Sequence, residues 1–173
     1  MANLVDQSPM GFMDALCARI DGVLQRQWWY PAEAADEFRA PAVHAQYLPV
    51  SKTEATDRDK TKDYPLVQVV CTSGEIAGFG EVTHGSEIRH EIYFGGYSND
   101  TDNQGWRIPM AMLWHVMQDL LANTIINGYR LDTPVRWTPL NSREPPYYTA
   151  KLETIWKGRP PAIESPDESV GIR

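Results

Sequence analysis

The chain has 173 residues, of which 42% are hydrophobic, so it is long and apolar enough to fold as one domain with a real core. Its 16 basic and 23 acidic residues give a net charge of -7. Nucleic-acid binding needs clustered basic residues, so this balance disfavours a general nucleic-acid binder, and we expect no sequence-specific nucleic-acid binding. The chain lacks the roughly 18-residue apolar run of a membrane span and the charged start of a signal peptide, so we expect the protein in the cytoplasm when it is made.

The first predicted element is an amphipathic helix that begins after Ser8 and Pro9. The serine hydroxyl can accept a hydrogen bond from a free amide of the first turn, and proline costs no hydrogen bond at the first helical position. Apolar residues then recur at steps of three and four, so one face should pack on a sheet. Cys17 on this helix and Cys71 further on lack partners at metal or redox spacing, and we interpret both as buried free thiols.

The middle of the chain predicts strands around a charged loop. Residues 41–50 are bounded by prolines and suit an edge strand. Residues 51–63 carry no large apolar side chain and are expected to form an exposed loop. Leu66–Cys71 is rich in β-branched residues and is predicted to lie at the sheet centre. Glu87–Tyr93 alternates between polar and apolar residues, which predicts an antiparallel strand with one wet face.

The later elements are a turn, a long helix and two strands. Residues 95–103 have the composition of a turn. A helix is predicted from about Gly105 to Asn127, with Gly128 as its left-handed C-cap. Strands follow at Val135–Thr138, between two prolines, and at Tyr147–Trp156.

This order of elements predicts an α+β fold. We expect one mainly antiparallel sheet of about four to five strands, with a mixed sheet as the alternative, flanked by an N-terminal helix and a long central helix. Residues 1–157 are assigned to a single domain. Residues 158–173 are rich in proline and poor in apolar residues, so they are assigned to an extended or disordered tail.

No group of side chains suggests a reaction centre. His90 and Glu91 would point to opposite faces of a strand, and His115 with Asp119 is a common pair on a helix face. Ser73 lacks the glycine-framed turn of a catalytic nucleophile, and the nearby glycines lack the Lys-Ser/Thr pair of a phosphate-binding loop. We therefore expect no catalytic residue, no cofactor and no metal. The six tryptophans and eight tyrosines are more informative, because several lie near element ends, where aromatic residues often anchor protein interfaces.

Short motifs in a fixed order run from Asp63 to Trp156 of the sequence. They are Asp63-Tyr64-Pro65, Ile92-Tyr93-Phe94-Gly95-Gly96-Tyr97, Gln104-Gly105-Trp106, Gly128-Tyr129-Arg130-Leu131, Pro134-Val135-Arg136-Trp137 and Pro146-Tyr147-Tyr148. In their order and spacing they resemble the tail terminator, or tail completion, proteins of long-tailed (siphovirus-type) bacteriophages. The N-terminal helix and the charged loop fit that family more loosely.

The resemblance implies a structural virion protein that forms a homo-hexameric ring on the head-proximal end of the tail. Such a ring stops growth of the tail tube and presents the head-tail joining surface. Its partners would be the tail tube protein and the head-tail connector or neck proteins. DNA can pass through the ring lumen, and no membrane is involved. Because a closed ring uses head-to-tail contacts, two different patches on each copy must match.

Two polar segments are expected to reach neighbouring copies or the lumen, because the core does not need them: the loop at 57–63 and the turn at 98–103. The interface candidates are Asp57, Arg58, Asp59, Lys60, Asp100, Asp102, Trp106 and Tyr147. Three alternatives stay open at this point. They are another ring protein of the same particle (a connector, a stopper or the tube subunit), a small enzyme with a dispersed site, and a host-encoded adaptor that binds one protein as a monomer.

Overall fold

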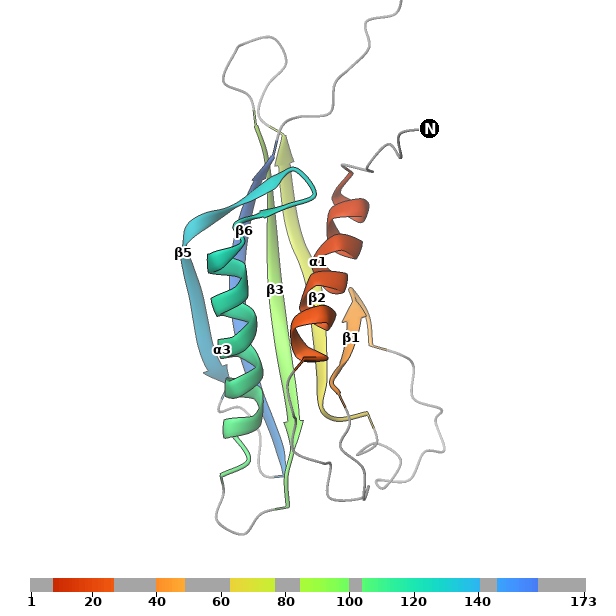
Figure 1. Cartoon of the computed structure of the whole chain (residues 1–173), viewed down its shortest axis with the longest axis vertical. Helices are drawn as coiled ribbons and strands as arrows, with labels where there is room; N and C mark the ends of the chain where they lie inside the picture. Colours follow the sequence, from red (N-terminus) through yellow and green to blue (C-terminus); the bar gives the residue numbers. More distant parts are fainter. Residues whose placement is uncertain are drawn as a thin grey trace, which may run out of the picture.

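Two helices cover one face of a six-stranded sheet in the computed structural model, which describes residues 8–26, 40–48, 63–76, 85–99, 104–140 and 146–158 (Figure 1). The elements are α1 (Pro9–Leu24), β1 (Ala42–Ala45), β2 (Leu66–Ile76), β3 (Ser86–Tyr97), α3 (Arg107–Ala122), β4 (Ile125–Ile126), β5 (Tyr129–Leu140) and β6 (Tyr147–Gly158). The predicted α+β class and both helices are confirmed. The sheet has six strands, not four or five.

The strand order is β1-β2-β3-β6-β5-β4, and only the β1–β2 pair is parallel, so the sheet is mixed. β3 and β6 form its centre, paired from Ser86–Gly158 to Tyr97–Tyr147. The prediction that Leu66–Cys71 lies at the centre was therefore wrong, because β2 is second from the edge. Its apolar run reflects burial of Val67 and Val69, which are both fully buried in the core. The edge position of β1 was predicted correctly.

β3 runs through Gly95 and Gly96, so the turn predicted from residue 95 was wrong. A Cβ atom on Gly95 would lie 2.9 Å from the ring of Tyr64, and one on Gly96 would lie 2.9 Å from Cδ of Pro109. These glycines therefore serve a close approach between the strand and its neighbours, including the first turn of α3. A turn was predicted because glycines are common both in turns and at strand positions where a neighbouring segment comes close.

β5 is longer than the strand predicted at Val135–Thr138 and contains both flanking prolines. Beyond the short β4 pairing it is an edge strand, where a missing amide costs little. A bulge between Asp132 and Arg136 contains Pro134. The length of β5 depends on its pairing with β6. Because β6 lies further along the chain, the local sequence pattern of β5 could not predict this length.

The long helix ends at Ala122, five residues before the predicted end at Asn127. Ile125 and Ile126 form β4 instead and pair back onto β5. Asn127 (φ 47°) and Gly128 (φ 83°) make the two-residue hairpin turn between them. Gly128 has the left-handed backbone that was expected, but it belongs to a hairpin and not to a helix C-cap.

α1 begins as predicted, because the Ser8 Oγ accepts a hydrogen bond of 3.1 Å from the Gly11 amide. A paired guanidinium and carboxylate connect the two helices: Arg19 Nε lies 2.6 Å from Asp119 Oδ2 and Arg19 Nη2 lies 2.7 Å from Asp119 Oδ1. Asp119 thus binds α1, whereas His115 had been considered as its partner. Cys17 and Cys71 are free thiols in half-buried positions, and burial raises the pKa of Cys17 to about 11.

Candidate functional site

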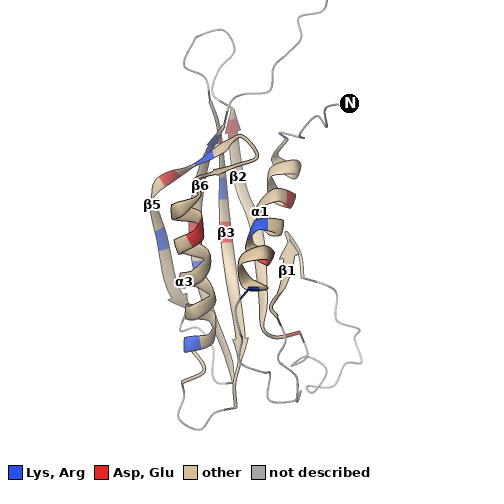
Figure 2. Cartoon of the chain, in the orientation of Figure 1, with Lys and Arg blue, Asp and Glu red and all other residues tan. Residues whose placement is uncertain are grey.

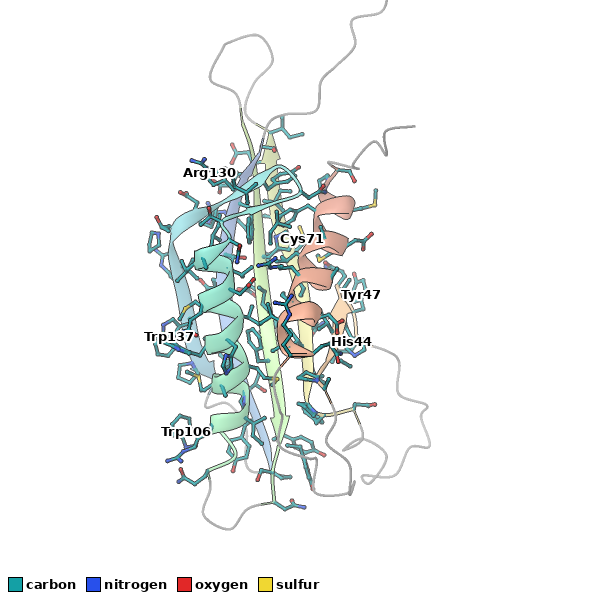
Figure 3. All side chains as sticks on the ribbon, in the orientation of Figure 1. His44, Tyr47, Cys71, Trp106, Arg130 and Trp137 are labelled. Carbon is teal, nitrogen blue, oxygen red and sulfur yellow. The ribbon has the colours of Figure 1, made fainter. Side chains whose placement is uncertain are left out.

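Six of the eight predicted interface residues, namely Asp57, Arg58, Asp59, Lys60, Asp100 and Asp102, lie outside the described residues. Trp106 stands in the turn before α3 and is 49% exposed. The guanidinium carbon of Arg107 lies 5.8 Å from the centre of the Trp106 ring, so a cation covers part of this aromatic surface. Trp106 is thus placed where it can contact another protein (Figure 3).

Tyr147 is half-buried at the start of β6 and takes part in packing. Its ring centre lies 5.4 Å from that of Tyr64 and 5.3 Å from that of Tyr97, and these tyrosines come from three separate chain segments. The Ser98 amide also donates a 3.0 Å hydrogen bond to the Pro146 carbonyl. Tyr147 therefore holds one end of the sheet together, and only its exposed part can serve an interface.

Gly105 packs directly on the neighbouring Tyr148, so replacing it should destabilise the fold. An added Cβ would lie 2.3 Å from Tyr148 Cε2 and 2.7 Å from Ser98 Cβ. We expect Gly105→Ala to lower the free energy of unfolding by about 1–3 kcal/mol, measured by urea unfolding. Gly22→Ala is the matched control, because nothing lies within 4 Å of a Cβ there and alanine favours the helix by about 0.5–1 kcal/mol. Equal effects of both changes would contradict this packing role.

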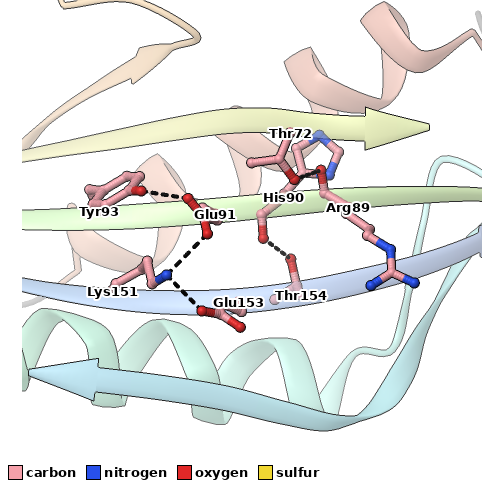
Figure 4. Close-up of polar contacts among 8 residues, drawn as sticks. All are labelled: Thr72, Arg89, His90, Glu91, Tyr93, Lys151, Glu153 and Thr154. Carbon is pink, nitrogen blue, oxygen red and sulfur yellow. Dashed lines mark hydrogen bonds and ion pairs between the residues drawn. The ribbon is translucent and has the colours of Figure 1, made fainter.

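The face of the sheet without helices carries ordered ion pairs (Figure 4). Lys151 Nζ lies 2.6 Å from Glu153 Oε1 and 3.0 Å from Glu91 Oε1, and the Tyr93 hydroxyl donates to Glu91 Oε2. The hydrogen bonds from Tyr93 and Lys151 lower the pKa of Glu91, and those to Glu153 and Glu91 raise the pKa of Lys151. Each charge is thus held in its ionised form, which suits a fixed polar surface better than proton transfer.

A hollow of about 150 Å³ lies beside this network. Its lining includes Arg89, Glu91, Arg136 and Glu153, so it contains both signs of charge. Arg89 is engaged by Glu87 at 2.6 Å, and Glu153 by Lys151. The side chains of Arg89 and Glu153 at the hollow are therefore already engaged by partners within the sheet.

His90 is buried on the helix-covered face, with 1% of its surface exposed. Its ring packs 5.3 Å from that of Phe12, and neither ring nitrogen has a hydrogen-bond partner in the part of the chain that is described. Burial lowers the pKa of His90 to about 4. The alternation of Glu87–Tyr93 had already placed His90 with Ile88 and Ile92 on one side, so the signal for its burial was present in the sequence.

The exposed hydrophobic side chains come from elements at the two opposite edges of the sheet. One group, here called the α3–β5 flank, comprises Trp106, Trp114, Leu121, Ile125 and Trp137. The other, the α1–β1 flank, comprises Met10, Tyr47, Leu48 and Ile76 from α1, the end of β1 and the end of β2. Figure 3 shows Trp106 and Trp137 on one side of the molecule and Tyr47 on the other. Sequence reasoning found Trp106 but missed Trp114 and Trp137.

The described ranges contain no group of three or more His, Cys, Asp or Glu side chains that could hold a metal ion. No helix within them is long and apolar enough to cross a membrane. No protein-family model matches the sequence, and no curated protein matches it either.

Proposed function

We propose that this protein is a ring-forming structural subunit that caps the head-proximal end of a siphovirus-type phage tail tube, ends tube polymerisation and forms the head-tail joining surface. The observation that carries the proposal is the pair of unlike apolar flanks on opposite sides of one sheet. Copies that meet head to tail need two different matching patches, whereas a two-fold dimer needs only one.

The size of the α3–β5 flank suits a stable contact. Trp106, Trp114 and Trp137 are each about half exposed, at 46–49%. Three half-exposed tryptophans leave about 300 Å² to bury, which corresponds to about 7 kcal/mol at roughly 25 cal/mol per Å². Association entropy consumes a large part of that energy, so single pairs would be weak and the closure of a ring would add the decisive contacts.

The proposed mechanism is recognition by shape and charge, without a chemical step. One end of the ring would dock on the last tube ring, and the other would lack the surface that recruits a further tube subunit. The ion-paired face of the sheet supports this reading, because its charges are fixed by their neighbours. A rigid surface of this kind loses little side-chain entropy on docking.

Tube assembly provides the test. The purified protein, added to the tail tube protein of the same phage during polymerisation, should shorten the tubes and label one end only, as seen by electron microscopy. A rival tube subunit would instead extend tubes or polymerise indefinitely by itself. A connector or stopper would leave tube length unchanged and bind the head. Tubes of normal length with bare ends would overturn the proposal.

A further inference from the structure

We infer that neighbouring copies join through their sheet edges, the outer edge of β5 at Val135–Thr138 in one copy pairing with the outer edge of β2 at Ser73–Ile76 in the next. This contact would make the sheets continuous around the assembly. The inference rests on the proposed function, because it assumes that the occupant of each edge is a second copy of this chain. It goes further by naming the strands that meet.

The outer edge of β5 is open along most of its length. β4 pairs only with Tyr129 and Arg130, and the Leu131 amide donates a 2.7 Å hydrogen bond to the Thr124 carbonyl. From Asp132 onward, the outer side of β5 has no partner among the described residues. Pro134 and Pro139 lack amides and bracket the four residues Val135–Thr138, so pairing is confined to that short stretch.

The outer edge of β2 is covered over its first half only. β1 pairs with Leu66–Val69. The Gln46 side chain then extends this cover, since the Cys71 amide donates a 3.0 Å hydrogen bond to Gln46 Oε1. Ser73–Ile76, the last four residues of β2, have no strand on their outer side in the described part of the chain. Two free edges of equal length thus lie at opposite sides of one sheet.

The strand directions suit this pairing. β2, β3, β6 and β5 are successively antiparallel, so β5 runs antiparallel to β2. A neighbouring copy related by rotation about a ring axis, with its strands tilted to that axis in the same way, would therefore offer its β5 to β2 in the antiparallel sense. Antiparallel pairing is also slightly the more stable of the two kinds.

The two free edges are offset along the strands. Arg136 of β5 pairs with Glu153 of β6, Glu153 pairs with Glu91 of β3, and Glu91 pairs with Val70 of β2. Arg136 is therefore level with Val70, which precedes Ser73–Ile76 along β2. Because β2 has a bulge between Cys71 and Ser73, the offset is about four residues, or about 13 Å along a strand. From β2 to β2 of the next copy there are about four strand spacings, or about 19 Å. Their ratio gives a strand tilt of about 35°, at the lower end of the range that closed barrels use, so the offset is compatible with a closed ring.

Each side of the sheet carries charges of both signs (Figure 2), including arginines without an ion-pair partner among the described residues on the β5 side and aspartates on the α1 side. Arg107, Arg130 and Arg136 lie on the α3–β5 side, and none of them has an ion-pair partner in the described ranges. Asp14 is exposed and Asp21 is partly exposed on α1 at the other flank. Head-to-tail contact can set the arginines of one copy beside these aspartates of the next, which favours that contact.

Disulfide trapping tests the contact. Ser73 and Thr138 pair with Arg89 and Lys151, so both lie on the face of the sheet without helices. In a Cys17→Ala, Cys71→Ala background, Ser73→Cys protein is mixed with Thr138→Cys protein, with and without tail tubes, and oxidised. We expect the mixed Ser73–Thr138 disulfide to form at least tenfold more than in the control. The control replaces Thr138→Cys with Thr149→Cys, which is on the same face of β6, a strand already paired on both sides.

The products separate the possible outcomes. A double Ser73→Cys, Thr138→Cys protein should give a covalent ladder that stops at one closed size. Homodisulfides between two Ser73→Cys or two Thr138→Cys chains, or no product above the control, would overturn the edge contact. If the mixed disulfide forms but the protein leaves tube length unchanged, the edge contact stands and the capping function fails. If tubes are capped without the mixed disulfide, the capping function stands and the edge contact fails.

Discussion

Replacing Phe12 with alanine should lower the free energy of unfolding by about 3–5 kcal/mol. Phe12 is fully buried and joins α1 to three strands of the sheet. Its ring centre lies 4.8 Å from that of Tyr129, 5.0 Å from that of Trp156 and 5.3 Å from that of His90. The change removes both the apolar contact and the packing that positions the helix. Because single domains are stable by about 5–15 kcal/mol, the loss would be a large share of the total.

Urea unfolding followed by tryptophan fluorescence measures this effect. Trp106→Ala is the control, because Trp106 is 49% exposed and its truncation should change the stability by less than about 1 kcal/mol. The two variants also separate folding from assembly. Phe12→Ala should fail in both, whereas Trp106→Ala should fold normally and associate less well. A Phe12→Ala protein as stable as the parent would show that α1 does not anchor the core as described.

The stability of the protein should fall by about 3 kcal/mol as the pH drops from about 6.5 to about 4. The cause is His90, whose pKa is lowered from 6.5 to about 4 by burial, with its ring packed against that of Phe12. In this interval the unfolded chain binds a proton at His90 and the folded chain does not. Acid therefore favours unfolding, and the contribution of His90 to stability is fully present only above pH 6.5.

His90→Leu should flatten this pH dependence, because it removes the titrating group from the core. Urea unfolding at half-unit steps from pH 7.5 to 4.5 measures the slope for both proteins. The carboxylates Glu91 and Asp132 act in a lower window, since their pKa values are lowered from 4.5 and 3.8 by hydrogen bonds from Tyr93 and Lys157 respectively. An unchanged slope in His90→Leu would show that another group causes the acid sensitivity.

Local signals in the sequence predicted several parts of the fold well. Ser8 and Pro9 specify the start of α1, because capping depends on neighbouring backbone amides only. The alternation around His90 identified β3 and its buried side, because a strand has a period of two. Predictions failed at glycines, because glycine occurs in turns, in helix caps and at close contacts within strands. Gly95, Gly96 and Gly128 were interpreted from composition, and their roles depend on what packs against them.

The candidate surfaces were only partly predictable. Trp106 was identified from its place near a helix start, but Trp137 is exposed because β5 runs along the sheet edge beyond the cover of β4. Tyr147 packs with Tyr64 and Tyr97, and its role at an interface stays a prediction. No local pattern distinguishes an aromatic side chain at an open edge from one that closes the sheet.

The sequence by itself determined the α+β class, the two amphipathic helices and the approximate position of most strands. These features follow from capping and from hydrophobic period, which act over a few residues. The strand order, the two open edges and the separation of the exposed apolar residues into two flanks could be known only from the tertiary structure. Each of these depends on contacts between residues that lie far apart in the chain, and a local pattern carries no information about which distant segment supplies the partner.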